Sequence, residues 1–225
     1  MPRHFLRVLL SAFVLLPLFT VPAIGRSERM VAEKIEWTWE VTPDHPQADL
    51  PSVLLVGDSI TRNYYPAVAE DLAGKANVYL FSSSISIGDP RLVAELKQFF
   101  VMEHTRFRVI HFNNGMHGWG FSEAEYKAGF PALVRELRRA QPAAKLIWAN
   151  TTPVRKDNPD GATNARVTAR NEIADAIVKQ DRIPLDDQYA VIHQHPDMYN
   201  DDVHPNEKAS AIQARQAADM IAKLL

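Results

Sequence analysis

The feature that most constrains the fold of this chain is an apolar run that ends in Gly-Asp-Ser. Residues 53–56 are branched and apolar, and they lead directly into Gly57, Asp58 and Ser59. A short apolar run of this kind is typical of a buried strand, and residues 63–72 after it predict a helix. Ser59 is therefore expected where a central strand ends, which is where open α/β sheets bind their ligands.

Two interpretations of Gly-Asp-Ser follow from the residues alone. The simpler one is a strand-to-helix turn in which Asp58 or Ser59 caps the helix. The functional one is that Ser59 is a nucleophile, which requires a base beside its hydroxyl, because a serine is unreactive at its free pKa. The rest of the chain must supply that base.

Strands alternate with helices along the remaining sequence. Apolar runs predict strands at 77–81, 107–112, 145–149 and 183–185. Helical spacing of apolar residues predicts helices between them, at 91–104, after the capping box Ser122–Glu125, at 165–179 and at 205–224. Pro131 predicts a kink or a late start in the helix that follows the capping box. The alternation favours a mostly parallel five-stranded sheet with helices on both faces, a three-layer α/β/α fold.

The chain is expected to divide into three parts. Residues 1–25 combine basic residues, a short apolar stretch and Ala23-Ile24-Gly25, the pattern of a signal peptide cleaved after Gly25; an uncleaved anchor is the alternative. Residues 26–50 form a polar extension in which the alternation over 35–41 predicts an edge strand. Residues 51–225 form the main domain. An exported protein, periplasmic or secreted and without a stable membrane span after cleavage, is the expectation.

Charge and cysteine content exclude several classes of function. The net charge of −2 gives no electrostatic argument for binding nucleic acid. The absence of cysteine excludes thiol catalysis, disulfides and a lipid-modified cysteine.

A candidate base lies near the other end of the chain, in the segment Asp201-Asp202-Val203-His204-Pro205. Histidine is the usual base for a serine, because it accepts a proton near neutral pH. A carboxylate on the second ring nitrogen fixes the tautomer. One tight turn can supply both partners from Asp201 and His204, and Asp202 is the competing carboxylate.

With these residues in place, the chain resembles the SGNH (GDSL) hydrolase family. Gly57-Asp58-Ser59-Ile60 and Asp201-x-x-His204-Pro205 are similar to the first and last sequence blocks of that family, and the strand pattern is similar to its flavodoxin-like sheet. The resemblance implies that Ser59 is the nucleophile and that Asp201 and His204 complete the triad. It also implies an oxyanion hole built from the N–H of the serine, a glycine N–H of the second block and an asparagine side chain of the third block.

The two middle blocks depart from that family. Ser82-Ser83-Ser84 stands where the family has Asn-x-Gly, so the resemblance places an oxyanion N–H at Ser84, with Gly88 as the alternative. Gly115-Met116-His117-Gly118 stands where the family has Gly-x-Asn-Asp. The His117 ring can replace the asparagine amide as a donor, or can simply brace the loop. A shifted register would offer Asn113 or Asn114 instead.

The resemblance implies a serine esterase that needs no cofactor and that acts on small acyl esters, particularly O-acetyl groups on carbohydrate. A lipid-directed esterase, lysophospholipase or thioesterase is one alternative, and a non-catalytic carbohydrate-binding protein is another. Three aromatic residues can either stack on a sugar or pack in the protein: Trp37, Trp39 and Trp119. Polar residues near the base, including His193, His195 and Asp197, admit a metal site, although a solvated loop explains them equally well.

Overall fold

The computed structural model describes residues 1 and 31–225, so the predicted signal peptide lies outside the described residues. The described elements follow one another in the order β1 (Thr38–Val41), β2 (Ser52–Gly57), α1 (Ser59–Asp71), β3 (Asn77–Ser83), α2 (Pro90–Glu103), β4 (Phe107–Phe112), α3 (Glu123–Ala140), β5 (Lys145–Ala149), α4 (Asn164–Gln180), β6 (Leu185–Asp186), α5 (Gln188–His193) and α6 (Glu207–Ala222). Strands and helices alternate as the apolar pattern predicts.

The strands form one sheet in the order β1-β3-β2-β4-β5-β6. Strands β2 to β6 pair in parallel, and β1 pairs antiparallel to β3 with Thr38 opposite Ser83. The five parallel strands are those expected from the sequence, and β1 is the edge strand expected from the N-terminal extension. Because β2 lies between β3 and β4, the carboxyl ends of all three strands meet at one edge of the sheet.

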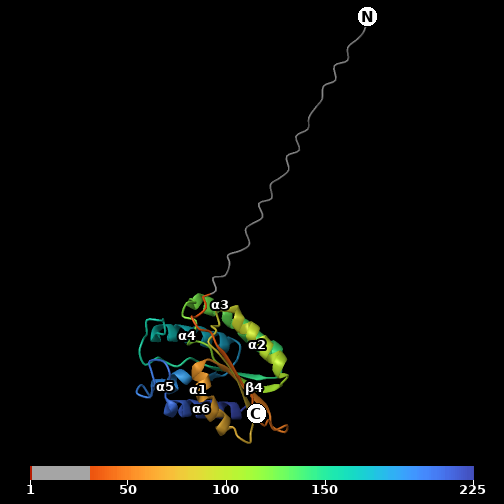
Figure 1. Ribbon diagram of the computed structural model, residues 1–225, viewed down its shortest axis with the longest axis vertical. Coiled ribbons are helices and arrows are strands. Elements are labelled where there is room, and N and C mark those ends of the chain that lie inside the picture. The colour runs from red at the N-terminus through yellow and green to blue at the C-terminus, as the bar shows by residue number, and fades with distance from the viewer. Residues whose placement is uncertain (2–30) are drawn as a thin grey trace.

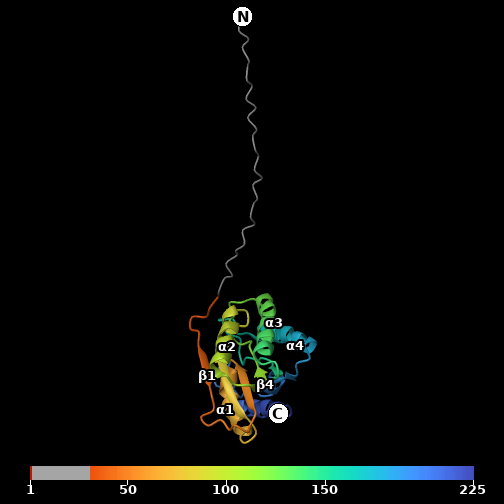
Figure 2. The same cartoon turned by 90° about the vertical axis from the view of Figure 1, so that its right-hand side faces the viewer.

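Helices cover both faces of the sheet, which makes the fold a three-layer α/β/α sandwich. Helices α2, α3 and α4 lie on one side of the sheet, and α1, α5 and α6 lie on the other (Figure 1). Turning the molecule by 90° shows β1 along its outer edge (Figure 2). Helices α1 and α6, which are far apart in the sequence, pack side by side.

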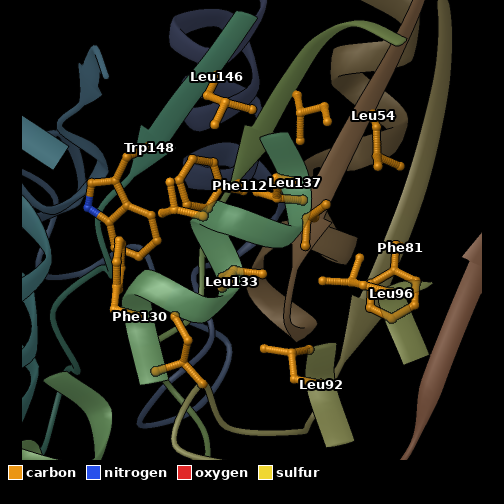
Figure 3. Close-up of a cluster of buried hydrophobic side chains, with 14 of the residues drawn as sticks. Leu54, Phe81, Leu92, Leu96, Phe112, Phe130, Leu133, Leu137, Leu146 and Trp148 are labelled. Carbon is orange, nitrogen blue, oxygen red and sulfur yellow. The ribbon is translucent and has the colours of Figure 1, made fainter. Parts of the chain in front are cut away.

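Each side of the sheet has its own apolar core. The core beneath α2 and α3 is rich in aromatic rings, among them Phe112, Phe130 and Trp148, whose ring centroids are 4.9–6.3 Å apart (Figure 3). The core beneath α1 and α6 is mainly aliphatic and includes Leu55, Val68 and Ile221. Burying both faces of the central strands explains why β2 reads as a continuous apolar run.

Several local expectations differ from the structure. Helix α1 begins at Ser59 rather than at residue 63, because Asp58 caps it. Helix α3 begins at Glu123, directly after its cap Ser122, and runs through Pro131, so it has no late start. Pro205 lies before the cap of α6 instead of in its first turn, because it forms an isolated bridge with Tyr199.

Candidate active site

Ser59 is the first residue of helix α1 and directly follows the end of strand β2. The side chain of Asp58 accepts a hydrogen bond from the backbone N–H of Ile60 at 3.0 Å, which caps the helix. The strand can turn this sharply because Gly57 has no side chain: a Cβ there would lie 2.0 Å from Oγ1 of Thr61. In the first turn of a helix the N–H groups have no partner within the helix, so the N–H of Ser59 lies at the positive end of the helix dipole.

Three residues from the two ends of the chain form a hydrogen-bonded relay. The Oγ atom of Ser59 lies 2.8 Å from Nε2 of His204, and Nδ1 of His204 lies 2.8 Å from Oδ2 of Asp201. This is the geometry in which a carboxylate orients an imidazole and the imidazole takes a proton from a serine.

The competing carboxylate, Asp202, makes a different set of contacts. Its Oδ1 atom accepts a hydrogen bond from Arg155 at 2.6 Å, and Arg155 also donates to the carbonyl oxygen of Asp201. Partial burial raises the pKa of Asp201, but hydrogen bonds from the backbone N–H groups of His204 and Val203 and from the His204 ring outweigh it and hold the pKa below its ordinary value. Asp201 is therefore the carboxylate that faces His204, held in its ionised form.

Ser84 does not have the free N–H that the sequence comparison placed there. The N–H of Ser84 donates to the carbonyl oxygen of Trp37 at 3.0 Å, and its hydroxyl donates to Oε2 of Glu36 at 2.7 Å. Ser84 thus anchors the segment that precedes β1, and the assignment of Ser84 to the oxyanion hole is wrong. The alternative, Gly88, is also engaged, because its N–H donates to Oγ of Ser86 at 3.2 Å.

The N–H of Ser86 remains as a candidate in the same loop. Its neighbours Ile85 and Ile87 both donate their N–H groups to side chains, whereas the Ser86 N–H donates to no group in the part of the chain that the structure describes. Ser86 also packs against the loop that carries His117, since a Cβ on Gly118 would lie 2.1 Å from Cβ of Ser86.

Asn113 and Asn114 both use their side chains to hold the loop after β4. The amide of Asn113 donates to the carbonyl oxygen of Ala149 at 2.7 Å. The amide of Asn114 accepts from the N–H of Ile87 and donates to the carbonyl oxygen of Ile85. Neither asparagine lines the cavity that contains Ser59, whereas His117 does, which favours the register in which His117 takes the place of the family asparagine.

His117 forms a second histidine–carboxylate pair in the site. Its Nδ1 atom lies 3.1 Å from Oε2 of Glu33, and the N–H of Gly118 donates to Oε1 of the same carboxylate at 2.7 Å. Burial lowers the pKa of His117, but the hydrogen bond with Glu33 and the negative charges of Asp58, Glu33 and Glu36 outweigh it, so the pKa is raised. His117 is thus stabilised as an imidazolium.

A buried arginine holds the loop that carries His117. The guanidinium of Arg170, on α4, donates to four backbone carbonyl oxygens, those of Gly115, His117, Gly118 and Phe121. It also lies 4.2 Å from the centre of the Trp119 ring. Burial lowers the pKa of Arg170 to about 10, which leaves the group charged at neutral pH.

The two histidines and Ser59 line one cavity of about 550 Å³, a volume typical of small-molecule sites. Trp119 forms part of its wall, half-buried and stacked against Arg166 and Arg170. A larger hollow of about 780 Å³ lies along α6 and β6, but no serine or histidine lines it. The chemistry therefore places the site in the smaller cavity.

Trp37 and Trp39 do not cover the core. Both rings contact the guanidinium of Arg62, at 4.9 and 4.6 Å from their centres, and Trp39 is 53% exposed. The edge of the Trp37 ring meets the ring of His117, with 5.6 Å between their centres. Trp37 therefore contacts a residue of the cavity wall, and Trp39 lies at the surface.

His193, His195 and Asp197, which suggested a metal site, do not line the cavity. The ring of His193 stacks on Tyr189, with 5.7 Å between their centres. Among residues 31–225, no group of three or more potential metal ligands is arranged to hold an ion.

No helix of the described chain is long and apolar enough to cross a membrane.

Sequence reasoning missed Glu33, Arg155 and Arg170. Arg170 left a signal, because it occupies an inward position of α4 at helical spacing from Val167 and Ala174, both of which are buried. Glu33 left none: it lies in a polar segment without a motif, and only tertiary packing brings it to His117. Arg155 left none either; it is exposed and is the partner of Asp202.

Comparisons with known proteins identify the family. Residues 55–212 match the sequence pattern of the GDSL-like Lipase/Acylhydrolase family. A comparison with curated proteins gives no match.

Solved structures share the fold at low sequence identity. A lipolytic G-D-S-L family member from Veillonella parvula has a TM-score of 0.62 at 20% identity, covering 77% of this chain and 99% of its own. The acetyl xylan esterase AlAXEase has a TM-score of 0.61 at 15% identity, covering 76% and 99%. A carbohydrate esterase family 3 protein from Talaromyces cellulolyticus has a TM-score of 0.60 at 18% identity, covering 78% and 98%.

Proposed function

This chain belongs to the GDSL-like lipase/acylhydrolase family, and from that membership we propose that it is a serine esterase that removes small acyl groups, above all O-acetyl groups, from carbohydrate. The family and the esterase neighbours make the chain a hydrolase that acts on ester bonds. The substrate class, the roles of individual residues and the export of the protein are our proposals.

One observation carries the proposed chemistry, namely the relay of two 2.8 Å contacts from Ser59 through His204 to Asp201. The Oγ atom of Ser59 attacks the ester carbonyl carbon while Nε2 of His204 takes the hydroxyl proton. The His204 imidazolium, stabilised by Asp201, then returns that proton to the leaving alcohol, which leaves an acyl-serine. Water, deprotonated by the same histidine, hydrolyses the acyl-serine and restores the free enzyme. These steps need no cofactor.

The negative charge that develops on the carbonyl oxygen needs donors that are already in place. We assign this role to the N–H of Ser59, the N–H of Ser86 and the ring of His117. The first lies at the start of α1, the second has no partner within the described residues, and the third lines the cavity with Ser59.

The walls of the cavity support a carbohydrate ester as the substrate. Polar side chains that can bind sugar hydroxyls line it together with one aromatic ring: Glu33, Lys34, Asn158, Asp160 and Trp119. Two structural neighbours are named as an acetyl xylan esterase and a carbohydrate esterase. A lipid-directed enzyme would instead need an extended apolar groove beside Ser59.

Export is proposed from the pattern of residues 1–25 alone. N-terminal sequencing of the protein recovered from the periplasm or the medium tests it. A mature chain that begins at Arg26 is the expected result, and a chain retained in the cytoplasm with Met1 intact would contradict it.

The catalytic proposal is tested by covalent labelling and by substrate profiling. A fluorophosphonate should label Ser59, as identified by peptide mass spectrometry, and labelling should abolish hydrolysis of nitrophenyl acetate. Turnover of nitrophenyl esters should fall as the acyl chain lengthens beyond a few carbons, and acetylated glycans should release acetate. A preference for long acyl chains would favour the lipid-directed alternative, and an unlabelled Ser59 would favour a binding protein without catalysis.

A further inference from the structure

The carboxylate of Glu33 joins two groups of the loop after β4. It accepts the N–H of Gly118 at 2.7 Å and lies 3.1 Å from Nδ1 of His117. Glu33 belongs to the segment before β1, which lies outside the residues 55–212 that match the family. The segment itself is anchored, because the N–H of Glu33 donates to Oε1 of Glu36 and Glu36 accepts the hydroxyl of Ser84.

This contact decides which atoms His117 can offer to a substrate. A carboxylate on Nδ1 makes Nδ1 the nitrogen that carries the proton. A neutral His117 would then present a lone pair from Nε2, and a lone pair repels an oxyanion. Only the imidazolium form carries a second N–H, on Nε2. Within the described residues Nε2 makes no hydrogen bond, and the ring lines the same cavity as Ser59 and His204.

We propose that Glu33 is the positioning residue of the oxyanion site: it orients His117 and keeps its ring cationic, so that Nε2–H can stabilise the developing charge on the substrate. This inference rests on the proposed function, because it assigns a supporting role within the same esterase reaction. It gives the N-terminal segment a part in catalysis that the family domain alone does not contain.

The charges around His117 agree with a cationic ring. Three carboxylates, those of Glu33, Glu36 and Asp58, raise its pKa against the effect of burial. The cations that oppose this effect are Arg170, which donates to the His117 carbonyl, and Lys34, which lines the cavity. Asp160 also lines the cavity and adds a negative charge.

Two histidines in one cavity then need opposite protonation states. His204 must be neutral to accept the serine proton, which limits turnover on the acid side. His117 must be charged to donate from Nε2, so turnover falls as the pH rises through the raised pKa of His117. The wild-type protein should therefore show a bell-shaped pH profile whose alkaline limb belongs to His117.

Two substitutions of Glu33 separate orientation from charge. In Glu33→Ala both contacts are lost, and kcat should fall by about ten- to hundredfold, as is usual when a supporting partner is removed. The alkaline limb should also move to lower pH. In Glu33→Gln the amide oxygen can still accept the Gly118 N–H while the amide NH₂ donates to Nδ1. The neutral ring then carries its proton on Nε2, so part of the turnover should return and the alkaline limb should disappear.

The matched control is Glu40→Gln, an exposed glutamate of β1 in the same N-terminal segment. It should leave kcat and both limbs of the pH profile unchanged. Melting temperatures of all variants show whether any loss of kcat arises from unfolding, because a purely structural Glu33 would lower stability and the height of the profile without moving its limbs.

A second measurement does not depend on esterase activity. The NMR resonances of the His117 ring, followed against pH, should titrate above the ordinary pKa of histidine in the wild-type protein and at lower pH in Glu33→Gln, where the neutral form should carry its proton on Nε2. A His117 titration that is the same in both proteins would overturn the inference even if the esterase is active. If that titration shifts while no ester is hydrolysed, the link between Glu33 and His117 stands and the proposed function fails.

Discussion

Arg170 donates a hydrogen bond of 2.7 Å from its buried guanidinium to the carbonyl oxygen of His117. Three further carbonyls of the same loop, at Gly115, Gly118 and Phe121, accept hydrogen bonds from this one side chain. A planar fork of donors can bind several carbonyls at once, and the carbonyls of Gly115 and His117 have no other hydrogen-bond donor among the described residues. The loop that carries His117 is therefore held from helix α4.

Replacing Arg170 should destabilise the protein. Arg170→Met removes the donor that the carbonyls of Gly115 and His117 have within the described residues. Each unpaired carbonyl costs about 1–3 kcal/mol, so a loss of a few kcal/mol is expected. Arg170→Lys should lose less stability than Arg170→Met, because an ammonium keeps three donors but lacks the planar fork. Urea unfolding measures the difference, with the exposed Arg139→Lys as control. Unfolding midpoints equal to wild type in both Arg170 variants would contradict this role.

Ser59→Ala should abolish esterase activity without unfolding the protein. Loss of a triad member commonly lowers the rate by about 10⁴- to 10⁶-fold. Steady-state kinetics on nitrophenyl acetate, with circular dichroism to verify folding, measure the effect. The control is Ser122→Ala, which removes the cap of α3, costs about 1 kcal/mol of stability and should leave kcat unchanged. A folded Ser59→Ala protein with near wild-type turnover would exclude Ser59 as the nucleophile.

The two neighbouring aspartates should differ strongly. Asp201→Asn removes the carboxylate that faces Nδ1 of His204. The ring can then carry its proton on Nε2, where it cannot accept the serine proton, so kcat should fall by up to about 10⁴-fold. Asp202→Asn weakens only an exposed ion pair with Arg155, worth about 1 kcal/mol or less. Parallel kinetics on the two variants decide the assignment. A larger loss in Asp202→Asn than in Asp201→Asn would reverse it.

His117→Ala should lower kcat by about 10²- to 10³-fold and change KM little, because an oxyanion donor acts mainly in the transition state. His117→Asn should restore part of the loss, since an amide can donate from a similar position. Asn113→Ala and Asn114→Ala should act through stability, because both side chains hold loops. Equal falls of melting temperature and kcat in both His117 variants would instead make the ring a brace.

A buried pair, His111 of β4 and Asp186 of β6, should make the stability of the protein depend on pH. Burial raises the pKa of Asp186, but hydrogen bonds and the charge interaction with His111, together with hydrogen bonds from Gln188 and Gln216, outweigh it and hold the pKa below its ordinary value. The folded pKa is depressed, so this stabilisation is present above the unfolded pKa, about 4, and is lost as the pH falls through the folded value.

Asp186→Asn should therefore cost about 3 kcal/mol or more at neutral pH, as expected for a broken buried pair, and the difference from wild type should shrink below about pH 4. Urea unfolding at several pH values measures it. Asp181→Asn, in an exposed pair with Arg138, is the control and should cost about 1 kcal/mol or less at any pH. A deficit that is constant with pH would show that the charge of Asp186 does not contribute.

The sequence by itself determined the alternation of strands and helices, and with it the class of fold. Apolar runs and helical spacing reflect burial, which is a local property of each segment, so β2 and the stripe of α3 could be predicted directly. Ser59 and the pair Asp201 and His204 could also be proposed, because Gly-Asp-Ser and Asp-x-x-His are each short, local patterns, although the two patterns are 145 residues apart.

Only the tertiary structure decided which hydrogen-bonding groups are free. The family resemblance points to Ser84, with Gly88 as the alternative, but both N–H groups donate within the fold, whereas the Ser86 N–H has no acceptor within the described chain. Glu33 lies 84 residues from its partner His117, and Arg170 lies 53 residues from it. Hydrogen bonds are short and directional, so they depend on where folding places distant backbone segments, and no local pattern of residues encodes that placement.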